Sequence, residues 1–208
     1  MNQTPGASTG NRPGPPPKPQ SVGELVARLR DEASRRGSTF PRLEGLVANV
    51  IVTQMMPPSV VKGGTGMRLR YGDAYTRETP DLDTSLRDDL AQFLTDLESL
   101  LVAGWGGFTG ESVAGRRRAP KDVPAEYAMQ PVTVRLFYQG RLFTTVVLEI
   151  GYDELEATTD PALELVQSPE VLAVFAALGL EEPRPVPVLP LHHQMAQKIH
   201  ACTEPGSE

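Results

Sequence analysis

The chain has 208 residues, of which 39% are hydrophobic and 22% charged, and its formal net charge is −6. This length suits one sizeable core with small additions, and the composition is that of an ordinary globular protein. No apolar run approaches the roughly 20 residues of a membrane helix, and no signal-peptide pattern opens the chain. Cys202 is the single cysteine and cannot form an internal disulfide. We therefore expect a cytoplasmic protein with no membrane partner.

The first twenty residues contain six prolines, three glycines and almost nothing apolar. Such a segment cannot bury enough surface to offset its chain entropy. We predict a disordered tail over residues 1–20, with order beginning at Ser21.

Helix signals dominate the next part of the chain. Ser21 and Glu24 have capping-box spacing before an apolar stripe, and Pro41 is placed to open a second helix. Val60-Val61 then reads as a short strand, followed by a glycine turn over 62–65 and a short helix.

Strands and helices alternate after residue 80. We expect a strand at 81–83, a helix over 87–102, a hairpin of strands 132–138 and 142–150, and a helical region over 161–179. An extended proline connector leads to a last helix near Leu191 that carries Lys198. This order predicts an α+β class with a small mixed sheet flanked by helices.

Asp81 and Asp83 carry the first chemical signal. Residues two apart on a strand point to the same face, and two adjacent carboxylates are costly unless a cation neutralises them. Mg²⁺ is typically bound by one or two carboxylates together with substrate phosphates. The pair therefore predicts a metal site, although a lone Asp-x-Asp is more often a solvated loop or a helix cap.

Two neighbouring features strengthen that prediction. Gly63, Gly64 and Thr65 stand between a strand and a helix, where backbone N–H groups can approach a phosphate closely. Glu149 interrupts the apolar run that contains Leu148 and Ile150, so alternation directs it away from them, as a residue aimed into a site would be.

The order of these features is that of the polymerase-β-like nucleotidyltransferases. Three segments resemble the AbiEii/AbiGii nucleotidyltransferase toxins in particular: Val61 to Thr65, Thr76 to Asp83, and His192 to Ala201. The run Gly104 to Thr109 is also similar to the mycobacterial MenT group. The resemblance covers roughly residues 21–203.

The resemblance implies a Mg²⁺-dependent toxin that moves a nucleotide from a nucleoside triphosphate to the 3′ end of tRNA. Aminoacylation and translation would be blocked, and a cognate antitoxin would restrain the toxin. By position, the metal ligands would be Asp81 and Asp83, and the catalytic set would add Lys198 and Glu149. The nucleotide-binding residues would be Lys62, Gly63, Gly64, Thr65 and Arg77.

Thr79 matches a hydroxyl position just before the acidic pair, which makes it a candidate for a modification that adds negative charge. Residues 21–190 would form the nucleotidyltransferase domain, and residues 191–208 would start a C-terminal helical region that is shortened relative to the family. Because that region carries another functional Asp in the family, an alternative is a catalytically inactive binding module. An Asp-x-Asp glycosyltransferase is a further rival, which the Gly-Gly turn argues against.

Three other features have plainer readings. For His192-His193, we favour a pair of surface histidines at the start of a helix, and we consider a metal site less well supported. Trp105 and Phe108 are favoured as core or loop anchors over base-stacking groups. The basic run from Arg116 to Lys121 is slightly favoured as a solvated face over a phosphate-binding patch.

Overall fold

Seven strands and six helices make up the described part of the computed structural model. The strands are β1 (Val60–Val61), β2 (Asp81–Leu86), β3 (Phe108–Ala114), β4 (Gln130–Tyr138), β5 (Arg141–Tyr152), β6 (Glu164–Val166) and β7 (Val186–Val188). The helices are α1 (Val22–Arg36), α2 (Phe40–Gln54), α3 (Gly63–Tyr71), α4 (Leu90–Ala103), α5 (Pro169–Leu178) and α6 (Leu191–Thr203).

The structure describes residues 14, 16–72, 76, 79, 81–86, 89–117, 128–152 and 163–203; the side chains at 152, 197, 198 and 200–203 lie outside this description. Among these residues, no helix combines the length and the apolarity needed to cross a membrane.

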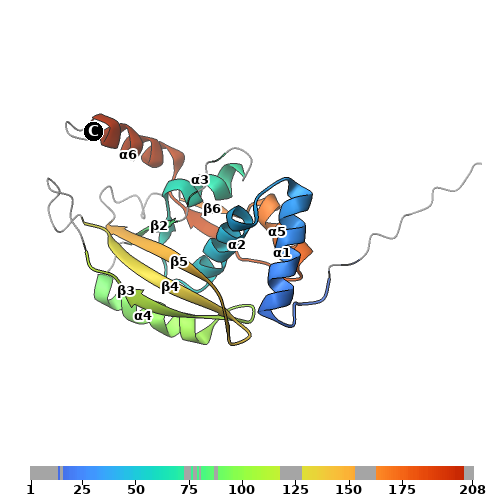
Figure 1. The fold of residues 1–208 in the computed structure, drawn as a ribbon. Helices are drawn as coiled ribbons and strands as arrows, with labels where there is room; N and C mark the ends of the chain where they lie inside the picture. Colours follow the sequence, from blue (N-terminus) through green and yellow to red (C-terminus); the bar gives the residue numbers. More distant parts are fainter. Residues whose placement is uncertain are drawn as a thin grey trace, which may run out of the picture.

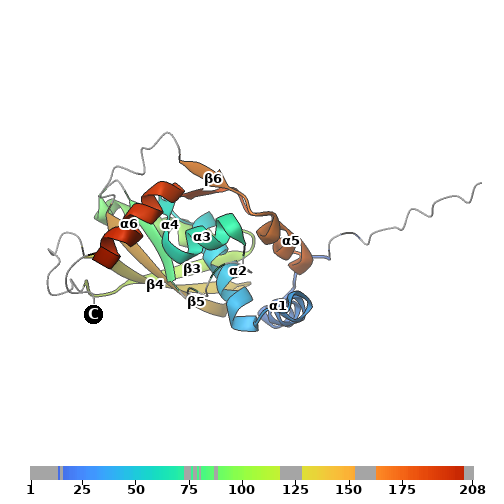
Figure 2. The ribbon, with the colours of Figure 1, turned by 90° about the horizontal axis from the view of Figure 1, so that it is seen from above.

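One mixed sheet organises the fold, with the strand order β3-β4-β5-β2-β1-β7-β6. The β2–β5 and β1–β7 pairs are parallel, and the other pairs are antiparallel. Helix α4 packs along β3, while α1 packs against α2 and α5 at the other side of the molecule (Figure 1). Helix α6 lies on the side of α3, away from α1 and α5 (Figure 2). The predicted class, α+β with a mixed sheet flanked by helices, is confirmed.

Strand alternation gives the sheet two different faces. One face and the helices α1, α2, α4 and α5 enclose the main core. The strand residues of that core include Val61, Leu82, Leu86, Val132, Val134, Leu136, Val146, Leu148 and Ile150. The opposite face is more polar: it carries the exposed Thr133, Arg135 and Thr145 and the half-buried Glu149.

Local chemistry explains where most helices begin and end. The side chains of Ser21, Asp89 and Ser168 accept hydrogen bonds from the first-turn N–H groups of α1, α4 and α5. Gly37 and Gly179 end α1 and α5 in the left-handed conformation. The predicted start of α1 at Ser21, the opening of α2 around Pro41 and the end of α4 at Gly104 are confirmed.

Residues 16–20 are packed on the domain, although the sequence predicts them to be part of a disordered tail. The Tyr138 hydroxyl donates to the Pro19 carbonyl at 2.7 Å, and the Arg28 guanidinium donates to the Pro17 carbonyl at 2.6 Å. Prolines already restricted in φ lose little further freedom on docking, and their free carbonyls are good acceptors. The prediction of a disordered segment through residue 20 is therefore wrong for 16–20.

Three strands were not predicted. Residues 164–166 form β6 rather than the start of a helix over 161–179, because Ser168 caps α5 and Pro169 opens it. Within the proline connector, β7 pairs in parallel with β1, and Val188 is in register with Val61 although it follows Pro187. Strand β3 pairs along its whole length with residues 132–138 of β4, and this long-range pairing is not visible in its local sequence.

Candidate functional site

The two aspartates of β2 lie on the polar face of the sheet. Leu82, between them, is completely buried in the main core, so Asp81 and Asp83 point the other way, and both are half-buried. In the parallel β2–β5 pair, Asp83 is in register with Glu149, and Asp81 with Val147. The tertiary structure therefore brings Glu149 to the same face as the acidic pair, as predicted from its alternation.

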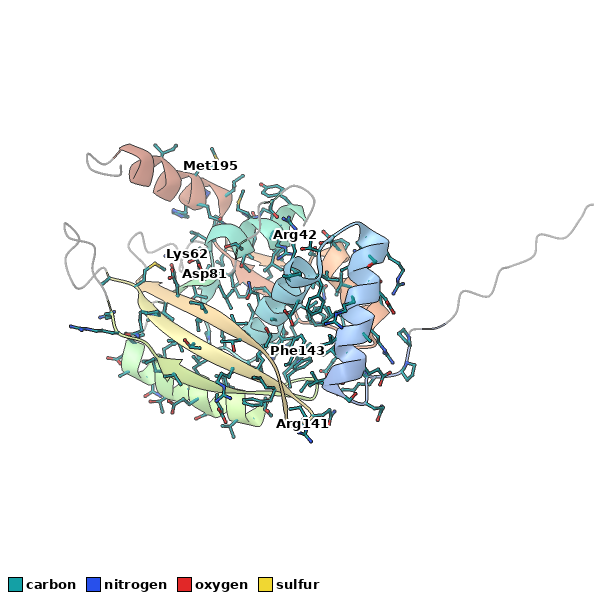
Figure 3. All side chains as sticks on the ribbon, viewed as in Figure 1. Arg42, Lys62, Asp81, Arg141, Phe143 and Met195 are labelled. Atoms are coloured by element: carbon teal, nitrogen blue, oxygen red, sulfur yellow. The ribbon has the colours of Figure 1, made fainter. Side chains whose placement is uncertain are left out.

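Lys62 extends this row on the other side of Asp83. Its N–H donates to the Asp83 carbonyl at 2.9 Å, so Lys62, Asp83 and Glu149 follow one another across three strands. A Cβ added at Gly151 would stand 2.8 Å from Lys62 Nζ, which places the ammonium above β5 on this face. Figure 3 shows Lys62 beside Asp81 at the α6 end of the sheet, with Arg141 at the opposite end.

Gly63 is required at the start of α3 for two reasons. Its φ is +61°, and a Cβ there would stand 2.0 Å from Asp83 Oδ2. The adjacent Gly64 lies against Thr79, whose Cβ would stand 2.7 Å from an added Cβ. The absent side chains thus let the helix N-terminus approach both Asp83 and Thr79.

The N-cap residue of α3 does not cap this helix with its own side chain. The N-cap residue is Lys62, which makes no cap hydrogen bond because an ammonium group has no acceptor. First-turn N–H groups have no intrahelical partner and carry the positive end of the helix dipole. This end of α3 is suited to an anion and lies directly beside the Asp83 carboxylate.

The side chain of Thr65 makes hydrogen bonds within the fold. Its side chain is 1% exposed, and its hydroxyl donates to the Asp81 carbonyl at 3.0 Å while accepting from Asn49 Nδ2 at 3.1 Å. The hydroxyl has a single proton, which is committed to Asp81. The side chain of Thr65 therefore joins α2, α3 and β2, so the predicted contact with a phosphate would come from its backbone N–H.

The donor set fits a magnesium ion that is completed by a substrate. Among the described residues, no three His, Cys, Asp or Glu side chains group closely enough to hold a metal ion. Asp81 and Asp83 nonetheless supply oxygen donors on one face, and the glycine at 63 leaves the space that the Asp83 carboxylate occupies. Two carboxylates plus phosphate oxygens is a usual magnesium environment.

Two predicted residues cannot be placed. Arg77 and the side chain of Lys198 lie outside the described residues, although the backbone of α6 carries position 198. Two arginines of α3 make contacts within the fold. Arg68 is buried and donates to the Arg42 carbonyl at 2.6 Å, and Arg70 pairs with Glu164 at 2.9 Å.

Asn49 and Arg42 of α2 were missed by sequence reasoning. The Arg42 guanidinium donates to the Thr76 carbonyl, so α2 holds the segment that leads to the aspartates as well as Thr65. The available signal was a single amide, Asn49, inside the apolar run of α2. A buried amide is costly unless it makes hydrogen bonds. An isolated polar residue in an apolar stripe therefore indicates a buried hydrogen bond.

A cavity of about 170 Å³ lies behind Thr79, lined in part by Arg42, Glu44, Asn49 and Arg68. Burial raises the pKa of the Glu44 carboxyl above its ordinary value, and the nearby Arg30 opposes this shift. The cavity adjoins the site but lies on the side of α2.

The aromatic pair predicted as anchors belongs to the core. Phe108 is 1% exposed, with its ring 4.6 Å from that of Tyr138, and Trp105 packs near Phe175 with a ring separation of 6.2 Å. Their core reading is confirmed.

Comparison with known proteins identifies the family. The model of the nucleotidyl transferase AbiEii toxin family, of type IV toxin–antitoxin systems, matches residues 47–208. The chain belongs to the AbiEii family. The match includes the Gly63-Gly64 turn, both aspartates, Glu149 and α6, which confirms the family resemblance read from the motifs.

Two solved structures are similar to this chain. A proposed nucleotidyltransferase from Helicobacter pylori is 19% identical, with a TM-score of 0.42, and covers 76% of this chain. JHP933, also from H. pylori, is 19% identical with the same TM-score and covers 78%. This chain spans only 56% of each of those chains. No protein of curated function matches it.

Proposed function

We propose that this AbiEii-family chain is a toxin that transfers a nucleotide from a nucleoside triphosphate to the 3′ end of tRNA, using Mg²⁺. One observation carries the proposal: Asp81 and Asp83 share a half-buried face beside the N-terminus of α3, where the N-cap residue Lys62 makes no side-chain cap hydrogen bond. A carboxylate pair for a hard cation next to backbone donors for a phosphate chain is the requirement of nucleotidyl transfer.

The residues of the chain have separate tasks in this reaction. The first-turn N–H groups of α3 would hold the triphosphate, and the Lys62 ammonium would offset its negative charge. Asp81 and Asp83 would hold the metal. When bound, Mg²⁺ supplies acidity to the attacking hydroxyl and neutralises charge on the phosphates. Transfer joins the acceptor oxygen to the α-phosphorus and releases pyrophosphate.

Glu149 is proposed as the later acidic residue of the site. Its register with Asp83 places it one strand away on the same face, where its carboxylate would face the acceptor hydroxyl. Lys198 and Arg77 are proposed to supply further positive charge around the triphosphate. Positioning and fixed charge would account for most of the acceleration.

The acceptor and partner follow from the family likeness. The run Gly104 to Thr109 and the acidic motif resemble the MenT group, which supports tRNA as the acceptor. Blocked aminoacylation, and hence blocked translation, would be the effect. A cognate antitoxin is the proposed protein partner, since the family is that of a toxin–antitoxin system. We propose that the toxin acts in the cytoplasm, where charged tRNA is used.

Thr79 is proposed as a site of inhibitory modification. Its side chain contacts the Gly64 position at the start of α3, where the triphosphate would bind. A phosphate on the Thr79 hydroxyl would place negative charge in the same space and compete with the substrate for the helix N-terminus.

An extension assay tests the proposal. The purified chain is incubated with Mg²⁺, each labelled nucleoside triphosphate in turn, and total tRNA. The same assay uses tRNA whose 3′ end has been oxidised with periodate. Asp81→Asn and Asp83→Asn are compared with Glu98→Gln, an exposed carboxylate on α4 that serves as the matched control.

The proposal would be supported if label enters intact tRNA but not oxidised tRNA, and does so only with the unmutated chain and Glu98→Gln. The labelled triphosphate that reacts would then name the nucleobase. Binding of a nucleoside triphosphate without any transfer, by a folded protein, would instead favour the inactive binding module. Transfer that persists in both aspartate variants would contradict the assigned metal site.

A further inference from the structure

Asn49 is a buried amide in an apolar part of α2. It is 2% exposed, and its neighbours Ala48 and Val50 are buried in the core. A buried amide is costly unless it makes hydrogen bonds. Its Nδ2 group donates to Thr65 Oγ1 at 3.1 Å, so the amide is directed at the first turn of α3.

The Thr65 hydroxyl links Asn49 to β2 through two hydrogen bonds. It accepts from Asn49 and donates to the Asp81 carbonyl at 3.0 Å. A hydroxyl has one proton, and accepting a hydrogen bond from Asn49 orients the hydroxyl so that its proton is directed to Asp81. Asn49 therefore fixes the direction of the bond that Thr65 makes.

This bond replaces a missing part of the sheet. Strand β1 ends at Val61, which pairs with Thr84, and Lys62 N–H reaches the Asp83 carbonyl at 2.9 Å. The next carbonyl on that edge of β2 belongs to Asp81, where no residue of β1 remains to donate. The Thr65 hydroxyl is the donor at that position and continues the ladder by one residue.

We propose that Asn49 is a positioning residue for the metal site and acts on Asp81 through the Thr65 hydroxyl. The inference rests on the proposed function, because it assigns Asp81 to a cation. Asp81 is the first residue of β2, where fewer strand bonds hold the backbone. The position of its carboxylate therefore depends on how firmly the Asp81 backbone is held. Groups that orient metal-binding carboxylates typically change metal affinity by about 10- to 100-fold when they are removed.

Binding of Mn²⁺ to the full chain tests this without requiring turnover. Free Mn²⁺ is measured by electron paramagnetic resonance during titration of the unmutated protein, Asn49→Ala and Asp81→Ala, the last giving the background. Gln54→Ala is the matched control, because Gln54 is also a buried amide of α2, but its side chain bonds to Arg184 instead of to the site. The unfolding midpoint in urea is measured for each variant.

We expect Asn49→Ala to bind Mn²⁺ about 10-fold more weakly than the unmutated chain. Gln54→Ala should keep its Mn²⁺ affinity, even though its unfolding midpoint in urea should fall by about as much as that of Asn49→Ala. Equal Mn²⁺ affinity in Asn49→Ala and the unmutated chain would overturn the inference and leave the metal site intact. No specific Mn²⁺ binding by the unmutated chain would overturn the metal site and the inference together.

A second pair of variants applies if Asn49→Ala does not fold. Thr65→Val keeps the shape of the side chain and removes the hydroxyl, whereas Thr65→Ser keeps the hydroxyl. We expect Thr65→Val to bind Mn²⁺ about 10-fold more weakly than the unmutated chain. Thr65→Ser should bind Mn²⁺ almost as tightly as the unmutated chain. Equal Mn²⁺ binding by the two variants would overturn the relay through the hydroxyl.

Discussion

The Asp83 carboxylate occupies the space in which a side chain at Gly63 would lie, with Oδ2 only 2.0 Å from an ideal Cβ position. Residue 63 is also in the left-handed region, with φ of +61°. The start of α3 and the acidic strand β2 therefore fit together only when a glycine stands between them. This contact joins the proposed phosphate-binding turn to the proposed metal site.

Gly63→Ala should abolish nucleotidyl transfer, because the added Cβ displaces the Asp83 carboxylate. The left-handed conformation alone costs a non-glycine residue about 1–2 kcal/mol. Gly37→Ala is the matched control: its φ is +64°, and no atom lies within 4 Å of the added Cβ. Both variants should lose a similar free energy of unfolding in urea, but only Gly63→Ala should lose activity. Activity in Gly63→Ala equal to that of Gly37→Ala would contradict the role given to this contact.

Lys62→Gln should raise the KM for the nucleoside triphosphate about 10-fold, since the ammonium lies on the acidic face beside the helix N-terminus that would hold the phosphates. Initial rates at varied nucleotide concentration measure this effect. Arg141→Gln removes a positive charge from the opposite end of the sheet (Figure 3) and should leave KM unchanged. An equal shift in both variants would indicate only a change in overall charge.

Thr79→Glu should reduce transfer by at least about 100-fold, because a carboxylate against Gly64 repels the triphosphate from the start of α3. The expected change is in nucleotide binding, which equilibrium titration with a labelled triphosphate measures directly. Thr95→Glu places the same charge on the exposed surface of α4 and serves as the control. Normal nucleotide affinity in Thr79→Glu would argue against Thr79 as an inhibitory site.

Tyr138 should make the stability of the domain sensitive to alkaline pH. Burial raises the pKa of its hydroxyl above the ordinary value, and the hydroxyl donates to Pro19. The folded state thus holds the proton more tightly than the unfolded state. This contribution to stability is complete below pH about 10 and is lost as the pH rises through the raised folded pKa.

Tyr138→Phe should remove that part of the alkaline loss and cost about 1 kcal/mol at neutral pH, because the hydrogen bond to Pro19 disappears. Urea unfolding at neutral pH and at pH values above 10 measures both effects. An unchanged slope of stability with pH in Tyr138→Phe would show that other groups determine it.

Local patterns predicted the elements whose chemistry is local. Ser21 and Pro41 indicated the starts of α1 and α2, and the alternation of 132–138 with the Gln139-Gly140 turn predicted the β4–β5 hairpin. Strands β3, β6 and β7 were missed, because they exist through pairing with residues far away in the chain. No local pattern in a proline connector shows that Val188 will lie beside Val61.

The sequence by itself determined the family, the acidic pair and the glycines, since two carboxylates at strand spacing after a Gly-Gly turn form a pattern that is readable along the chain. Only the tertiary structure decided how these groups are held. It placed Glu149 in register with Asp83, directed the Thr65 hydroxyl to Asp81 instead of outward, and recruited Asn49 from α2. Sheet register and buried hydrogen bonds join residues that are distant in sequence, and the packing of the whole core fixes which of them meet.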